Sequence, residues 1–253
     1  MSCPSCGGAE VMRRRCLACG GRLARASGKR SRQRAAETRR RDGVVDLAAV
    51  CAAAGDVALL DLGWAVLLLP LLVTLVVLGP PGSGKSTLAS VVALVLAGVH
   101  GVPVLYYSVE EGSAPGALRR FRRAARALGC PVPPGVALSD ARDTAEADAD
   151  LRRFEHALDG RTGFVIVDSL SDLEADEAWW RRLLTTGHGV LLVQHTVTSG
   201  QPRSGLEPAF AVDVVIHVES GGRAVPVKSR WSRTGDEAAF DVHAPRLPRG
   251  ATP

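Results

Sequence analysis

Short apolar runs alternate with amphipathic stretches of helical length over most of the chain. The runs span residues 71–78, 102–108, 163–168 and 189–194, and the amphipathic stretches span 85–98, 117–129, 145–159 and 174–186. This alternation predicts an α/β fold with a mostly parallel sheet and helices on both faces. Three shorter apolar runs follow at 213–219, 224–228 and 238–242, joined by Gly-rich or polar turns, and predict hairpins at a sheet edge.

The uncharged, almost wholly apolar segment 64–78 invites comparison with a membrane span. It is shorter than the roughly 20 residues that a spanning helix needs, and Pro70 interrupts it. Its end also leads directly into a glycine-rich loop, where a buried parallel strand with a continuous apolar run is expected. We therefore predict a strand here and no membrane segment.

A phosphate-binding loop is the strongest chemical signal in the sequence. The pattern G-x-x-x-x-G-K-[ST] follows the run 71–78 and opens a helical stretch, which is the context that such a loop requires. Its glycines let backbone N–H groups turn toward phosphate oxygens at the positive end of a helix. We predict that Lys85 reaches the β- and γ-phosphates of ATP and that Ser86 ligates Mg²⁺. The residues are Gly79, Pro80, Pro81, Gly82, Ser83, Gly84, Lys85, Ser86 and Thr87.

Two further carboxylates are candidates for ATP hydrolysis. Asp168 ends the run 163–168, where P-loop enzymes carry the acid that holds Mg²⁺ and its waters; the alternative is an acid that caps the next helix. Ser169 follows it instead of Glu, so the group that activates water must come from another strand end. Glu110 and Glu111 follow the run 102–108, and Glu110 is the predicted general base. Alternatively, both acids simply favour a helix N-terminus.

Polar side chains also end the run 189–194. Ligands gather at the carboxyl ends of strands in open α/β sheets, so Gln194 or His195 is a candidate sensor of the γ-phosphate. A purely structural role for either residue is the alternative.

Four of the six cysteines form two C-x2-C pairs, each followed by glycine, at Cys3, Cys6, Cys16 and Cys19. This spacing predicts a zinc ribbon with four thiolate ligands, and redox chemistry is the alternative. Paired cysteines that bind metal, and a start without an apolar signal core, indicate a reducing cytoplasm.

The positive charge is concentrated between Arg13 and Arg41. Between Arg22 and Arg41, Glu37 is the only acidic residue. This stretch has no apolar face, so we expect a linker or a solvated helix. The predicted organisation is a zinc ribbon over 1–24, a basic linker over 25–43 and an ATPase domain over 44–253. Excess positive charge also makes nucleic acid a candidate partner.

The order of these motifs resembles the RadA/Sms family of bacterial DNA-repair and recombination ATPases, which have a RecA-like fold. The resemblance rests on the cysteine pairs, the phosphate loop, V-L-Y-Y-S-V-E-E, V-I-V-D-S, the Gln194–Gly200 stretch and K-S-R-W-S at 228–232. Two departures are Thr198 in place of the family's lysine and the lack of its C-terminal Lon-protease-like domain.

This resemblance implies that Glu110 is the base, that His195 is the sensor, and that Lys228 and Arg230 act in ATP hydrolysis or DNA engagement across a ring interface. A solvated basic edge strand is the alternative for that pair. The implied function is a DNA-stimulated ATPase, with ATP, Mg²⁺ and Zn²⁺, that forms a ring on single-stranded or branched DNA. Alternatives are a plasmid- or phage-type replicative helicase, or a zinc-ribbon regulator with a nucleotide switch and little turnover.

Overall fold

A computed structural model describes residues 59–64, 67–110, 115–196, 207–231 and 234–248, together with the backbone of two short strands near the N-terminus. The chain divides into two units, Met1–Val57 and Ala58–Pro253. In the first unit, β1 (Val11–Met12) pairs with β2 (Arg15–Cys16) in antiparallel fashion. Cys3, Cys6, Cys19, the side chain of Cys16 and the basic linker lie outside the described residues, so the zinc ribbon and the two predicted boundaries stay predictions.

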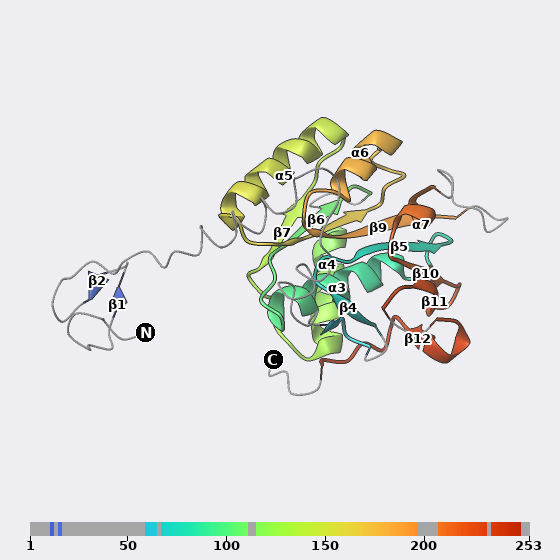
Figure 1. The fold of residues 1–253 in the computed structure, drawn as a ribbon. Helices are drawn as coiled ribbons and strands as arrows, with labels where there is room; N and C mark the ends of the chain where they lie inside the picture. The colour runs from blue at the N-terminus through green and yellow to red at the C-terminus, as the bar shows by residue number, and fades with distance from the viewer. Residues whose placement is uncertain are drawn as a thin grey trace, which may run out of the picture. The chain divides into compact units, whose positions relative to one another are not determined.

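One eight-stranded sheet dominates the second unit, with strand order β12-β11-β10-β5-β9-β8-β6-β7 (Figure 1). The strands from β10 to β7 run parallel, and β11 and β12 add an antiparallel edge. The phosphate-loop strand β5 therefore lies inside the sheet. The bounds are β5 Thr74–Gly79, β6 Val104–Ser108, β7 Val136–Ser139, β8 Phe164–Asp168, β9 Gly189–His195, β10 Val214–Val218, β11 Arg223–Ser229 and β12 Phe240–Asp241.

Helices cover both faces of this sheet because its central strands are apolar on both sides. Alternate residues of each strand join two separate cores. One core packs α3 (Lys85–Gly98) and α4 (Pro115–Leu128), and the other packs α5 (Thr144–Leu158) and α6 (Glu177–Leu183). Figure 1 shows the two helix pairs on opposite sides of the sheet. The predicted α/β class and the mostly parallel sheet are thus confirmed.

The differences from the predicted elements concern short segments. β10 and β11 form a hairpin as expected, but β10 is not at the edge, because it pairs in parallel with β5. Sequence inspection also missed β7, the short helix α7 (Glu207–Ala211), the 3-10 turn η2 (Asp236–Ala238) and a small hairpin of β3 (Leu59–Asp61) and β4 (Leu68–Pro70).

The apolar segment 64–78 contributes β4 and most of β5 to the fold. Among the described parts of the chain, we find no helix that is long and apolar enough to cross a membrane.

Close packing at the start of β9 makes Gly189 a sensitive position. A Cβ atom there would lie 2.2 Å from the Leu71 carbonyl oxygen and 2.3 Å from the Phe164 ring. We expect Gly189→Ala to destabilise the fold by about 1–3 kcal/mol, since overpacked cores must shift neighbouring atoms. Chemical denaturation measures this loss. Gly98→Ala is the matched control, because its Cβ would meet Pro133 only at 3.5 Å; equal stability of both variants would contradict this packing.

Candidate ATP-hydrolysis site

The carboxyl ends of four parallel strands bring the predicted site residues to one edge of the sheet. Gly79 at the end of β5 is in register with His195 at the end of β9, and Ser108 of β6 is in register with Asp168 of β8. Lys85 follows β5 through the phosphate loop, and Glu110 follows β6 by two residues. The sequence-predicted groups from four strand ends therefore converge.

The phosphate loop leaves a helix N-terminus available to an anion. Gly84 precedes α3 with φ of 101°, a left-handed conformation that favours glycine, and an added Cβ would lie 2.7 Å from Val242 Cγ2. Within this described helix, no side chain caps the N-terminus and no acid occupies the first turn. Its first N–H groups can thus serve a phosphate.

Lys85 is buried inside this loop, and its Nζ donates to the Pro80 carbonyl oxygen at 2.7 Å. Burial lowers the pKa of the Lys85 ammonium, while the negative charges of Asp168, Glu110 and Asp172 act to raise it. The buried Ser83 hydroxyl has no hydrogen-bond partner among the described residues. A cation and an unsatisfied donor in one loop fit the phosphates of a nucleotide.

Ser86 and Asp168 form the oxygen pair expected for Mg²⁺. The Ser86 hydroxyl donates to Asp168 Oδ1 at 3.0 Å, and Asp168 is only 4% exposed. Mg²⁺ prefers hard oxygen ligands and usually combines one or two protein oxygens with waters and substrate phosphates. These two residues would hold the ion beside the nucleotide.

Two residues that sequence inspection missed hold the other oxygen of Asp168. The Tyr106 hydroxyl donates to Oδ2 at 2.6 Å, and Arg120 Nη2 lies 3.4 Å from the same atom. Burial and then the Asp168 charge raise the pKa of Tyr106, so this phenol stays a donor. Tyr106 could have been found from the sequence, because it lies in an apolar run and a buried tyrosine hydroxyl usually has a hydrogen-bond partner. Arg120 comes from α4 and has no comparable signal in sequence.

Glu110 and His195 lie close together, beside an acid that sequence inspection missed, Asp172. His195 Nε2 lies 3.8 Å from Glu110 Oε2 and 3.7 Å from Asp172 Oδ2, and one ligand atom from each of the three lies within 4.8 Å of the others. Ser169 also donates to Asp172. The side chain of Glu110 is 59% exposed, so water can reach it. Glu111 lies outside the described residues.

A groove of about 80 Å³ lies beside the first turns of α3. It is lined by Thr87 and Val91 of α3, by residues of α4, and by the segment that follows β12. The α4 and C-terminal lining residues are Arg120, Arg123, Ala124, Ala127, Val242, His243 and Pro245.

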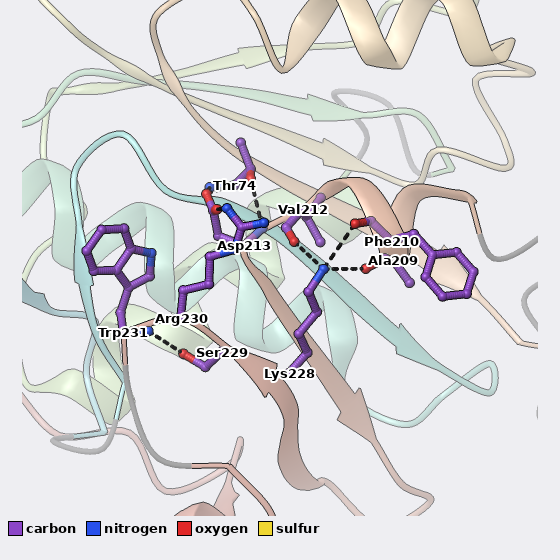
Figure 2. A network of polar contacts seen from close by, with 9 residues as sticks. All are labelled: Thr74, Ala209, Phe210, Val212, Asp213, Lys228, Ser229, Arg230 and Trp231. Carbon is purple, nitrogen blue, oxygen red and sulfur yellow. Dashed lines mark hydrogen bonds and ion pairs between the residues drawn. The ribbon is translucent and has the colours of Figure 1, made fainter. Parts of the chain in front are cut away.

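Lys228 and Arg230 do not lie at the carboxyl ends of the parallel strands, because Lys228 pairs with Val215 near the start of β10. Figure 2 shows the contacts that the two side chains make. The Lys228 ammonium donates to the carbonyl oxygens of Ala209, Phe210 and Val212, at 3.2, 3.1 and 2.6 Å. These bonds use all three of its protons. Lys228 therefore fixes the end of α7.

Arg230 pairs instead with Asp213, at 3.1 Å between Nη1 and Oδ1. The other oxygen of Asp213 accepts from the backbone N–H and the hydroxyl of Thr74. Thr74 begins β5, whereas the phosphate loop follows its far end, roughly 16 Å away at about 3.3 Å per residue. The pair thus lies at the opposite edge of the sheet from the phosphate loop of the same chain.

Comparison with known proteins agrees with this geometry. Residues 60–201 match the model of the AAA domain family. A KaiC-like protein from the hyperthermophilic archaeon Pyrococcus horikoshii has a similar fold, with a TM-score of 0.51 and 20% identity over 66% of this chain and 83% of that one. No curated protein matches the chain. The family match covers more than half of the sequence and includes the phosphate loop, Glu110, Asp168 and His195, and the chain therefore belongs to the AAA domain family of ATPases.

Proposed function

We propose that the chain hydrolyses ATP to ADP and phosphate with Mg²⁺, and that DNA stimulates this turnover. The observation that carries the first part is the convergence of Lys85, Asp168 and Glu110 at one sheet edge. The second part rests on the resemblance to RadA/Sms proteins and on the basic stretch before residue 44.

Each group has a distinct role in the proposed reaction. Water attacks the γ-phosphorus, Glu110 accepts a proton from that water, and the bond from the γ-phosphorus to the bridging oxygen of ADP breaks. Lys85 offsets negative charge on the β- and γ-phosphates. His195 lies 3.8 Å from Glu110 and would respond to the γ-phosphate. The groove beside Thr87 would receive the nucleoside end.

The function in the cell that we propose is processing of single-stranded or branched DNA during recombination and repair, in the cytoplasm. Steady-state ATP turnover with and without single-stranded DNA tests this proposal. Turnover that rises with DNA supports it. Turnover that ignores DNA would contradict the DNA-dependent part, and tight nucleotide binding with negligible turnover would favour a nucleotide switch.

Of Lys228 and Arg230, we expect Arg230 to act on a neighbouring copy of the chain in a ring. Its side chain is 65% exposed, whereas the Lys228 ammonium has all its protons bonded within the chain. Because it lies far from its own phosphate loop, any contact with ATP must be made in another subunit. Arginine fingers elsewhere increase rates by roughly 10³–10⁵. Arg230→Ala should therefore lower turnover far more than it lowers DNA affinity.

Mixing two inactive variants tests this arrangement. A site built from two subunits regains activity when Arg230→Ala is mixed with Lys85→Ala, because some interfaces then contain both intact halves. No recovery in the mixture, together with a lowered melting temperature for Arg230→Ala, would instead assign Arg230 a structural role through Asp213.

We also propose one zinc ion per chain, held by Cys3, Cys6, Cys16 and Cys19. Zinc binding contributes roughly 10–16 kcal/mol in such peptides, enough to fold a block with almost no core. Elemental analysis of protein purified without chelator should give close to one equivalent. Four free thiols and no zinc would contradict the ribbon.

A further inference from the structure

The outer face of α4 carries four arginines and no acid. Arg119, Arg122, Arg123 and Arg126 are all exposed, and we call them the arginine stripe. At 3.6 residues per turn, they fall within an arc of about 100°. The buried residues of α4 point the opposite way into the core and are Ala117, Phe121, Ala124, Ala125 and Leu128, whereas Leu118 is 45% exposed.

The charges of the arginine stripe are not neutralised within the described part of the chain. None of its four guanidinium groups has a carboxylate partner there, and the one hydrogen bond they make joins Arg119 Nε to the Pro115 carbonyl oxygen. The exposed arginines of α6 differ, because Arg181 pairs with Glu177 and Arg182 with Asp148. The stripe is therefore a concentrated, unpaired positive surface on a rigid helix.

We propose that the arginine stripe binds the phosphodiester backbone of a nucleic acid. Guanidinium groups suit phosphates because they can donate two parallel hydrogen bonds. From Arg119 to Arg126 the helix advances about 10 Å, which matches the axial length of about three phosphates on one strand. The inference rests on the proposed DNA-dependent function but assigns a surface that is separate from the basic linker and from Arg230.

A membrane surface fits this helix less well than a nucleic acid does. Amphipathic helices bind membranes by burying an apolar face in the headgroup region. The apolar face of α4 is already used in the core, where Phe121 and Leu128 are each 5% exposed. What remains outside is mainly charge, which favours a polyanion over a lipid bilayer.

The salt dependence of binding to an oligothymidylate strand, measured without ATP, tests the stripe. Each phosphate contact on a single strand adds about 0.7 to the slope of log affinity against log salt. Arg122→Gln/Arg126→Gln should lower the magnitude of this slope by about 1.4. With equal affinity at 1 M salt, this corresponds to about 25-fold weaker binding at 0.1 M salt. Neither residue lines the groove beside α3 or contacts Asp168, so ATP turnover without DNA should be unchanged.

Arg181→Gln/Arg182→Gln is the matched control, because it removes the same charge from exposed but paired arginines. The control should leave the slope unchanged. An equal fall in both double variants would overturn the proposal, since net charge alone would then explain the effect. Polyglutamate serves as a second probe. If Arg122→Gln/Arg126→Gln loses binding to polyglutamate but keeps its oligothymidylate slope, the proposal is also overturned, and an acidic protein is indicated as the partner.

The same measurements separate this inference from the proposed function. If the wild-type chain hydrolyses ATP faster with DNA but Arg122→Gln/Arg126→Gln keeps its salt slope, the arginine stripe alone is wrong. If the stripe carries oligothymidylate binding but DNA leaves turnover unchanged, the DNA-dependent ATPase proposal alone is wrong. A melting temperature like that of the wild type confirms that each variant is folded.

Discussion

Lys85→Ala should abolish ATP turnover, with a loss of at least about 10²-fold, as is usual when one preorganised group for a developing negative charge is removed. The ammonium is buried in the phosphate loop, and the negative charges of Asp168 and Glu110 act to raise its pKa. Among the described residues, Arg120 is another cation close to Asp168, and its guanidinium already pairs with that carboxylate. A coupled phosphate-release assay and a fluorescent-nucleotide titration measure the two consequences.

The matched control for this substitution is Lys228→Ala, which removes the same charge at the opposite edge of the sheet. In isolated chains we expect it to leave nucleotide binding intact, because Lys228 holds carbonyl oxygens of the α7 segment. Wild-type turnover in Lys85→Ala would mean that the ATP site lies elsewhere.

Glu110→Gln should separate nucleotide binding from hydrolysis. The amide keeps the size of the side chain but cannot accept a proton from water, and positioned bases contribute typically 10²–10⁴-fold. We therefore expect nucleotide affinity close to wild type and turnover lower by about that factor. Single-turnover hydrolysis measured beside a binding titration gives both values.

Two neighbouring acids serve as controls for Glu110. Asp172 is 3.7 Å from His195 and also accepts from Ser169, so Asp172→Asn should disturb the position of His195 and cause a smaller loss. If Asp172→Asn stops turnover while Glu110→Gln does not, Asp172 is the base. A defect confined to Glu111→Gln would instead shift the assignment by one residue.

The sequence predicted the layout of the fold well because its main signals are local. The four long apolar runs correspond to β5, β6, β8 and β9, and α3 has the predicted bounds of Lys85–Gly98. Since parallel strands place their carboxyl ends together, the positions of Lys85, Glu110 and His195 followed from the strand ends alone. The same reasoning could have included Asp172, which follows β8 by four residues.

Contacts between distant elements were beyond the sequence pattern. Arg120 belongs to an arginine-rich helix, and only the packing of α3 against α4 shows which of these arginines reaches Asp168. The resemblance to RadA/Sms proteins implied a role for Lys228 in ATP hydrolysis or DNA engagement, but its protons go to carbonyl oxygens 16 to 19 residues away. β10 resembled an edge strand because short strands lack a signal for their neighbours, and its partner β5 comes far earlier in the chain.

The position of β10 beside β5 has a consequence for synthesis on the ribosome. Asp213, which precedes β10, bonds Thr74 across 139 residues, and a Cβ on Gly79 would lie 2.3 Å from the Val218 carbonyl oxygen. At a synthesis rate of about 5–20 residues per second, the ribosome adds the 139 residues between Thr74 and Asp213 in roughly 7–28 s. During that interval the β5 edge that pairs with β10 stays unpaired, and the edge that pairs with β9 is unpaired until residue 189 has been made. Such unpaired edges of a highly apolar strand expose a nascent chain to aggregation. Slow translation before residue 214 should therefore lower the yield of folded protein.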